Sequence, residues 1–359
     1  MALFATFVDN LFTAIWRHYL VNPLNIMEKP EKSSIWFAVV NVFAASETAA
    51  TLWKDAEALL KEKGVLFHGT RTGRAGNAAE LTFDACMAGY RKFIAVGGDG
   101  TVHDVLNGIA AFLDWGASSG RGLSFSDFSL AVIPVGSGND WIKSLGLKAD
   151  LNAAVDAIAS GNLSKQDVVK VSLLAHDALP NEIELAVSYM VNVGGVGIDA
   201  KVCERVNAKK KEGKRGKILY VTSLIRAIAQ RKSVPVKVIC DGKIIFDGPY
   251  YSIALGVGKY SGGGMRQTPA AVLDDGLLDV TVIPELPFHR ILCEAPKLFT
   301  DKFLTVPELA VSKAKKILVL PQDLTAPQPV EVDGEVVGNA PVRFEVLDSL
   351  LNIAVPPVE

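Results

Sequence analysis

Short apolar runs alternate with amphipathic stretches along the first half of the chain. Residues 35–41, 92–96 and 129–133 contain continuous apolar runs with several β-branched side chains, a pattern typical of strands buried on both faces. Residues 46–63 and 101–113 place apolar side chains at helical spacing, so each predicts a helix with one buried face. Because these strands and helices alternate, we expect a parallel sheet with helices on both sides.

The pattern changes near residue 166. From there short β-rich runs dominate, at 168–174, 184–193, 234–240, 251–257, 277–283, 316–320, 330–332, 342–347 and 350–355. Helical patterns interrupt them at 198–209, 216–231 and 289–299. Many short strands at this spacing predict an antiparallel β-sandwich. We therefore expect an α/β domain over residues 33–165 and a β-rich domain over residues 166–359, whose last residues can pack back on the first domain.

The first 32 residues fit neither domain. Apolar side chains recur near helical spacing as far as Trp16, and Pro23 would end such a helix. We treat residues 1–32 as an N-terminal extension, either an interfacial helix or a stretch that precedes a true start at Met27. The sequence has no run of about 18 apolar residues, so no membrane span is expected.

Composition narrows the class of protein. Hydrophobic residues make up 49% of the chain and charged residues 21%, which is enough apolar material for a large core. The formal net charge of −2 gives no general attraction for nucleic acid, so no nucleic-acid partner is expected and phosphate recognition has to be local. The four cysteines are far apart and form no CxxC pair, which favours free thiols in a reducing compartment such as the cytoplasm.

Two glycine turns that follow predicted strands carry the candidate chemistry. The first, Gly97-Gly98-Asp99-Gly100-Thr101, directly follows the strand at 92–96 and opens the next helix. Its glycines would let backbone N–H groups approach phosphate oxygens, the helix N-terminus favours an anion, and Asp99 could hold a magnesium ion. A simple helix cap is the alternative, but a cap needs only one acidic or hydroxyl residue.

The second turn, Pro134-Val135-Gly136-Ser137-Gly138-Asn139-Asp140, repeats this design after the strand at 129–133. Both turns come at the carboxyl ends of their strands, where open α/β sheets bind ligands. Neither turn has the Gly-Lys-Ser/Thr of a Walker A loop, and neither fits the GxGxxG dinucleotide fingerprint. Two such turns at one sheet edge predict a nucleotide site of another kind.

The two turns, in this order and spacing, resemble the diacylglycerol kinase catalytic-domain family, which includes bacterial lipid kinases and sphingosine kinases. The family pattern GGDGTxNEVxNG followed by PxGTGND is matched by GGDGTVHDVLNG at 97–108 and PVGSGND at 134–140. Further motifs agree, namely TGRAGNA at 72–78, NVGGVGIDA at 192–200, GGGM at 262–265, DDGLLDV at 274–280 and DGE at 333–335. The resemblance covers residues 35–356, and the ordered set is more specific than any one motif.

The resemblance implies an ATP-dependent, magnesium-requiring lipid kinase with an NAD kinase-like or diacylglycerol kinase-like α/β domain and a β-sandwich domain for the lipid. Its substrate would be a diacylglycerol-like or sphingoid lipid at the surface of a membrane, reached from the cytoplasm by peripheral binding. The ATP site would comprise Asn41, Thr72, Gly97, Gly98, Asp99, Gly100, Thr101, Val102, His103, Ser137 and Asp140.

The resemblance also implies two magnesium sites. Asp99 and Asp140 would belong to the network around the nucleotide magnesium. Asp275 and the carbonyl oxygens of Val272 and Leu277 would hold a second, structural magnesium.

The turn Asp333-Gly334-Glu335 is implied to supply the general base. A lipid hydroxyl is a weak nucleophile, and a carboxylate within hydrogen-bond reach helps by taking its proton. On the residues alone, Asp-Gly also favours a type I′ hairpin turn, a role compatible with catalysis. Whether Asp333 or Glu335 is the base stays open, and Asp99 is the third residue expected to be essential for transfer.

The chain departs from the family pattern in three places. The family's first loop reads NPxSG, and this chain has Asn41-Val42-Phe43-Ala44-Ala45, without the proline or the glycine. We expect weaker ATP binding from this loop, because the Cβ of Ala45 stands in the path of a phosphate and a loop without proline is freer. His103-Asp104 replaces Asn-Glu, and Ser137 replaces threonine and keeps its hydroxyl.

Two rival functions remain. One is a kinase for a soluble substrate, such as NAD kinase, which shares GGDG; the segment from 262 to 280 argues against it. The other is a non-catalytic relative that binds lipid or nucleotide; the retained carboxylates argue against it. A basic run at 209–217 is either a solvated loop or a membrane-facing patch. The sequence leaves open which lipid is used and whether the chain forms a homodimer.

Overall fold

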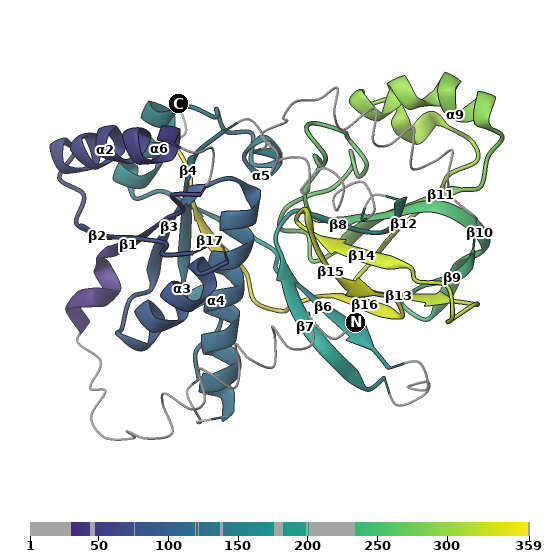
Figure 1. The fold of residues 1–359 in the computed structure, drawn as a ribbon, viewed down its shortest axis with the longest axis horizontal. Coiled ribbons are helices and arrows are strands. Elements are labelled where there is room, and N and C mark those ends of the chain that lie inside the picture. Colours follow the sequence, from purple (N-terminus) through teal and green to yellow (C-terminus); the bar gives the residue numbers. More distant parts are fainter. Residues whose placement is uncertain are drawn as a thin grey trace.

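Two β-sheets, one mostly parallel and one antiparallel, form the framework of the chain in the computed structural model, and they lie side by side (Figure 1). The structure describes residues 30–43, 47–74, 76–118, 120, 122–136, 139–175, 182–198, 200 and 234–357. Most of the predicted N-terminal extension, and the stretch 201–233 with its predicted helices and basic run, lie outside these residues.

A six-stranded sheet in the order β2–β1–β3–β4–β17–β5 forms the centre of the first domain. Its strands are β1 (Trp36–Val40), β2 (Phe67–Arg71), β3 (Lys92–Gly97), β4 (Ser129–Pro134), β5 (Leu163–Gln166) and β17 (Leu351–Ala354). All neighbours are parallel except β17 and β5, which are antiparallel. The carboxyl ends of β1, β3 and β4 therefore meet at one edge, and both glycine turns begin there.

Helices cover both faces of this sheet. They are α2 (Glu47–Glu62), α3 (Ala78–Met87), α4 (Asp99–Ser118), α5 (Asp140–Ser144) and α6 (Leu151–Ser160), with the 3-10 turns η1 (Pro30–Ser34) and η2 (Phe125–Asp127). Side chains alternate along β1, so Ala38 and Val40 are buried with α2 and α6 on one face, and Val39 is buried with α3 and α4 on the other.

An eleven-stranded antiparallel sheet forms the second domain, in the order β15–β14–β8–β10–β9–β13–β16–β6–β7, with β11 beside β10 and β12 beside β11. Its strands are β6 (Val169–Leu174), β7 (Glu184–Met190), β8 (Val193–Gly197), β9 (Pro235–Cys240), β10 (Lys243–Gly256), β11 (Leu278–Pro284), β12 (Ala310–Ala314), β13 (Lys316–Pro321), β14 (Pro329–Val332), β15 (Glu335–Asn339) and β16 (Val342–Val346). Valine and isoleucine dominate its core. Between β11 and β12 the chain forms a helical excursion, α9 (Phe288–Glu294), η3 (Ala295–Phe299) and η4 (Phe303–Thr305), drawn in light green in Figure 1.

This architecture confirms the predicted fold class, an α/β domain with a mostly parallel sheet followed by an antiparallel β domain. The chain passes between the sheets twice, because β5 still belongs to the first sheet, β6 begins the second, and β17 returns to the first. Next to this crossing, the buried indole of Trp141 in α5 donates a hydrogen bond of 3.1 Å to the side chain of Gln166.

Candidate active site

The first glycine turn joins β3 to α4 and leaves no room for a side chain at its first position. A Cβ on Gly97 would lie 2.1 Å from the hydroxyl oxygen of Thr101, so this position needs glycine. The Thr101 hydroxyl accepts a hydrogen bond of 2.9 Å from the side-chain amide of Asn41, which follows β1. The N-terminus of α4 thus opens at an edge lined by backbone, an amide and a hydroxyl, which suits an anionic group.

Asp99 links the two glycine turns. Its carboxylate accepts backbone N–H bonds from Asp140, at 2.9 Å, and from Trp141, at 3.2 Å, and so it caps α5. Burial raises the pKa of Asp99 to about 7; the two N–H bonds oppose this effect, and the negative charges of Asp140 and Asp333 add to it. Asp99 therefore lies among carboxylates that a bound cation would neutralise.

Asp140 connects the first domain to the glycine loop at 262–264 in the second. One carboxylate oxygen lies 2.6 Å from the ammonium of Lys143, and the other accepts a 2.6 Å hydrogen bond from the backbone N–H of Gly263. All three glycines of this loop have positive φ, which allows the loop to turn sharply toward α5.

Ser144 adds a second link at the end of α5. Its hydroxyl donates to the side-chain oxygen of Asn192, at 2.8 Å, and accepts the backbone N–H groups of Lys259 and Tyr260, at 3.1 and 3.2 Å. The amide of Asn192 donates to the carbonyl of Tyr260 at 2.9 Å. These bonds hold α5 against two loops of the second domain.

The Asp333-Gly334 pair forms the two-residue turn between β14 and β15. Both residues have positive φ, +50° and +88°, as the hairpin interpretation requires. The carboxylate of Asp333 is buried and accepts the backbone N–H groups of Val191, at 3.1 Å, and Asn192, at 2.9 Å. Glu335, in contrast, is exposed, and its carboxylate lies 3.0 Å from the position that a Cβ on Gly100 would take. The hairpin thus reaches the first glycine turn.

His103 and Asp104 occupy the first turns of α4, facing this hairpin. The Nδ1 atom of buried His103 lies 3.7 Å from a carboxylate oxygen of Asp333. Burial alone would lower the pKa of His103, but Asp333, Asp104 and Glu335 outweigh it and raise that pKa above its ordinary value. Burial raises the pKa of Asp104 to about 6, with His103 opposing and Glu335 adding to the effect.

The other predicted ATP-site residues differ in what they can offer a ligand. Thr72 is buried, and its hydroxyl accepts the backbone N–H of Val42 at 3.3 Å. The carbonyl of Gly98 accepts the first N–H bonds of α4 and so fixes the turn. The side chain of Val102 is buried in the core beneath α4, so only its backbone can face a nucleotide. Ser137 and the pair Ala44-Ala45 lie outside the described residues.

Asp275 belongs to a different group of contacts. The ammonium of Lys313 lies 3.2 Å from its carboxylate, 2.9 Å from the carboxylate of buried Asp279, and 3.3 Å from the carbonyl of Ala270. Lys313 therefore already supplies positive charge where the sequence predicts a magnesium ion on Asp275, Val272 and Leu277. That magnesium site stays a prediction, and an ion there would compete with the lysine for the carboxylate of Asp275.

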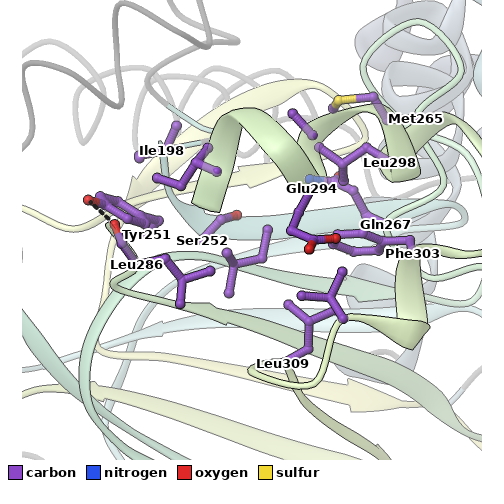
Figure 2. A pocket seen from close by; sticks show the side chains of 14 residues that line it. Ile198, Tyr251, Ser252, Met265, Gln267, Leu286, Glu294, Leu298, Phe303 and Leu309 are labelled. Atoms are coloured by element: carbon purple, nitrogen blue, oxygen red, sulfur yellow. Dashed lines mark hydrogen bonds between the residues drawn. The ribbon is translucent and has the colours of Figure 1, made fainter. Parts of the chain in front are cut away.

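An apolar pocket lies under the helical excursion of the second domain (Figure 2). Its empty space, mouth included, is about 660 Å³, within the usual range for small-molecule clefts. Figure 2 shows Leu298 and Phe303 on one side and Leu286 and Tyr251 on the other; Ser252, Gln267 and Glu294 are the other polar residues of an otherwise apolar lining. Met265, two residues after the glycine that binds Asp140, forms part of its wall, so one loop joins the pocket to α5.

Comparison with known proteins identifies the family of this chain. Residues 36–171 match the model of the diacylglycerol kinase catalytic domain, and residues 192–355 match that of the YegS C-terminal NAD kinase beta sandwich-like domain. The chain belongs to the diacylglycerol kinase catalytic-domain family. It is therefore a lipid kinase, a transferase that phosphorylates an alcohol group, as its motifs imply.

Relatives of this lipid kinase match it over most of their length. A diacylglycerol kinase of Staphylococcus epidermidis is 27% identical over 318 residues, which cover 89% of this chain and 91% of the relative. A diacylglycerol kinase of Bacillus subtilis is 24% identical over 283 residues, 79% of this chain and 83% of the relative. The crystal structure of a diacylglycerol kinase from Bacillus anthracis str. Sterne has a TM-score of 0.68 at 23% identity, over 90% of this chain and 98% of that one, which shows a shared fold.

A magnesium ion that accompanies a nucleotide fits the donor set of this kinase. Asp99 and Asp140 place carboxylates, the oxygen ligands that Mg²⁺ prefers, at the sheet edge where phosphates would lie. Within the ranges that the structure describes, no three His, Cys, Asp or Glu side chains are grouped closely enough to hold a metal by themselves. The nucleotide's phosphates and water would therefore supply the remaining ligands.

Sequence reasoning missed two features of the site. Lys143 is the cation that pairs with Asp140, and its spacing of three residues along a helix was the available signal. The pocket under α9 was also missed, although the helical pattern at 289–299 marks its cover.

In the described part of the chain, no helix combines the length and hydropathy needed to cross a bilayer.

Proposed function

We propose that this lipid kinase transfers the γ-phosphate of ATP to the hydroxyl of a diacylglycerol-like or sphingoid lipid and requires Mg²⁺. The nucleotide would lie at the edge formed by Asn41, the first glycine turn and Asp140, with its phosphates at the N-terminus of α4. This arrangement provides backbone donors and carboxylates, which are the groups that bind nucleotide phosphates and their magnesium ion.

We assign Glu335 as the general base. Both oxygens of Asp333 accept backbone N–H groups in a buried position, whereas Glu335 is exposed beside Gly100. The Glu335 carboxylate takes the proton of the lipid hydroxyl while the lipid oxygen bonds to the γ-phosphorus and the bond from that phosphorus to ADP breaks. Magnesium held by Asp99 and Asp140 would offset the charge of the phosphates.

The apolar pocket is the observation that supports a lipid as the substrate. Each methylene group buried there contributes about 0.8 kcal/mol to binding, so an aliphatic chain gains much from the site and a nucleotide or sugar gains little. The loop that contains Gly263 and Met265 connects the pocket to Asp140. A chain in the pocket would therefore extend its headgroup along this loop toward the phosphate-binding edge.

The surface around the pocket suits peripheral contact with a membrane. Phe288 and Phe299 on the helical excursion are 48% and 42% exposed, which is unusual for phenylalanine. We propose that they meet the lipid surface while the pocket takes up one chain. Three described cysteines, Cys86, Cys240 and Cys293, are free thiols, which supports a cytoplasmic location.

The test is a phosphotransfer assay with radiolabelled ATP, magnesium and a panel of acceptors. Diacylglycerol, sphingosine, monoacylglycerol and ceramide in mixed micelles are compared with NAD in solution, and labelled products are separated by chromatography. Labelling of a lipid that is lost in Glu335→Gln supports the proposal. Labelling of NAD alone, or of no acceptor, would overturn it. Full activity in Glu335→Gln would reject the assigned base but keep the substrate.

A further inference from the structure

One contact of the site joins the two domains through a pair of ionisable side chains. His103, in α4 of the first domain, faces Asp333, in the hairpin turn of the second, with 3.7 Å between the ring nitrogen and the carboxylate. Both side chains are buried, with 8% of each residue exposed. A buried charge contact of this kind resists rearrangement, because breaking it leaves one group without compensation.

The carboxylate of Asp333 is occupied in fixing the backbone. It accepts the N–H groups of Val191 and Asn192 between β7 and β8, so it ties the hairpin turn to the next strands of its sheet. Glu335 begins β15 directly after this turn. Any shift of Asp333 would therefore move Glu335 relative to Gly100.

We propose that His103 is a positioning residue that acts through Asp333 and holds the hairpin so that Glu335 stays over the first glycine turn. This inference rests on the proposed role of Glu335 as the base. His103 approaches from the opposite domain, so it also couples the orientation of the base to the docking of the two domains.

The surroundings of His103 favour the charged imidazolium. Asp104 from α4 and Asp333 and Glu335 from the hairpin face the ring with negative charge. Asn107, one helical turn on, places its amide nitrogen 3.4 Å from both ring nitrogens; this nitrogen is a donor, so it offers the imidazolium no acceptor, and it donates to the carbonyls of His103 and Tyr189. Loss of the proton at high pH would remove the attraction to Asp333 and loosen the hairpin.

The first measurement is the dependence of kcat on pH, from about 6 to about 9, with the lipid that the panel identifies. We expect kcat of the wild type to fall on the alkaline side, and His103→Asn or His103→Gln to lose that alkaline fall and to turn over about tenfold more slowly near neutral pH. KM for ATP should change less than twofold, because His103 acts through Asp333; a large rise would instead place His103 in the ATP site, as the resemblance implies, and would overturn the inference. His103 and Asp333 form one contact. The double variant His103→Asn with Asp333→Asn should therefore turn over no more slowly than Asp333→Asn alone. His68→Asn, at an exposed site on β2, is the matched control and should keep the wild-type profile.

Hydrogen exchange supplies a readout that needs no activity. The backbone amides of residues 191–192 and 333–335 should exchange faster in His103→Asn than in the wild type or in His68→Asn. Unchanged exchange together with an unchanged alkaline fall would overturn the inference. If the wild type labels no lipid, the proposed function fails, and the exchange data alone decide whether His103 orders the hairpin.

Discussion

Asp99 supports the structure as well as the proposed chemistry. The sequence predicts this carboxylate as a magnesium ligand and as a residue essential for transfer. The structure adds a second role, because Asp99 lies against the start of α5 and accepts two backbone N–H groups there. An essential residue that also caps a helix cannot be tested by activity alone.

We expect Asp99→Ala to abolish turnover and to lower the free energy of unfolding by about 1–2 kcal/mol, because a helix cap is lost. Turnover at saturating ATP and magnesium and urea unfolding measure the two effects. Asp150→Ala is the matched control, because Asp150 caps α6 through a 2.9 Å bond from Ala153 and has no place in the site. Asp150→Ala should lose similar stability and keep its activity; unchanged turnover in Asp99→Ala would remove Asp99 from the site.

The raised pKa of Asp99 predicts how stability depends on pH. The folded chain holds this proton up to about pH 7, whereas the unfolded chain releases it near pH 4. The stabilising contribution of the protonated group is complete below the unfolded value and is lost as pH rises through about 7. Asp99→Asn has no such proton, so its stability relative to the wild type should increase between pH 4 and 7 in urea unfolding. A constant difference across this range would contradict the shift.

Lys313 offers a test of the predicted structural magnesium. We expect Lys313→Ala to lower the free energy of unfolding by about 2 kcal/mol, because it leaves Asp275 and buried Asp279 without their cation. Millimolar magnesium should then raise the melting temperature of the variant more than that of the wild type. Lys315→Ala breaks only an exposed pair with Asp348 and should leave the stability close to that of the wild type. If magnesium changes the melting temperature of the wild type and of Lys313→Ala equally, no ion binds at Asp275.

At the scale of elements, α9, η3 and η4 act as the cover of the apolar pocket. Ala295 lies at the junction of α9 and η3 and lines the pocket. We expect Ala295→Trp to fill the space and raise KM for the lipid about tenfold or more, with KM for ATP unchanged. Leu163→Trp, at an exposed position on β5, adds a similar ring away from the pocket and should leave both constants unchanged. If Ala295→Trp raises KM for ATP but not KM for the lipid, the pocket is not the lipid-binding site.

Long elements with clear periodicity were predictable from sequence. β3, β4 and α4 agree with the predicted runs within a few residues, because buried strands and amphipathic helices carry their pattern locally. β5 and α5 were not predicted, since β5 is mostly exposed and polar and α5 has only five residues. Neither element shows a period that can be read without its neighbours.

The candidate site was predictable as a set of motifs but not as an arrangement. The glycine turns and the Asp333 turn carry recognisable residues, whereas the approach of Glu335 to Gly100 depends on how two domains dock. The same holds for His103, whose partner lies in a hairpin of the other domain. Lys313 could not be placed from sequence, because its contacts come from pairing β12 with β11.

At the scale of the whole molecule, the two domains are joined by more than the covalent chain. Asp140 binds Gly263, and Asn107 accepts the backbone N–H of Tyr189 at 2.9 Å. β17 adds a strand from beyond the second domain to the first sheet, in contact with β4 and β5. Stability and domain docking are therefore coupled, because the first sheet is complete only when the end of the chain has joined it, whereas the second sheet is built from one contiguous stretch.

Deletion of residues 350–359 tests this coupling. It removes Leu351 and Ile353, which are fully buried in the core of the first domain, so we expect a loss of at least about 4 kcal/mol and a largely unfolded first domain. Melting followed by tryptophan fluorescence measures the effect. Deletion of residues 357–359 leaves β17 intact and should melt like the full chain. Equal melting of the two deletions would mean that the strand adds nothing.

The position of β17 also sets an order of events during protein synthesis. A ribosome releases the first sheet's β1 to β5 long before residue 354 appears, so the nascent sheet has an open gap between β4 and β5 while the whole second domain is translated. The two strand edges at this gap expose unpaired backbone N–H and C=O groups, which can pair with strands of other nascent chains. Efficient production of this kinase should therefore depend on chaperones that shield the gap until the last strand closes it.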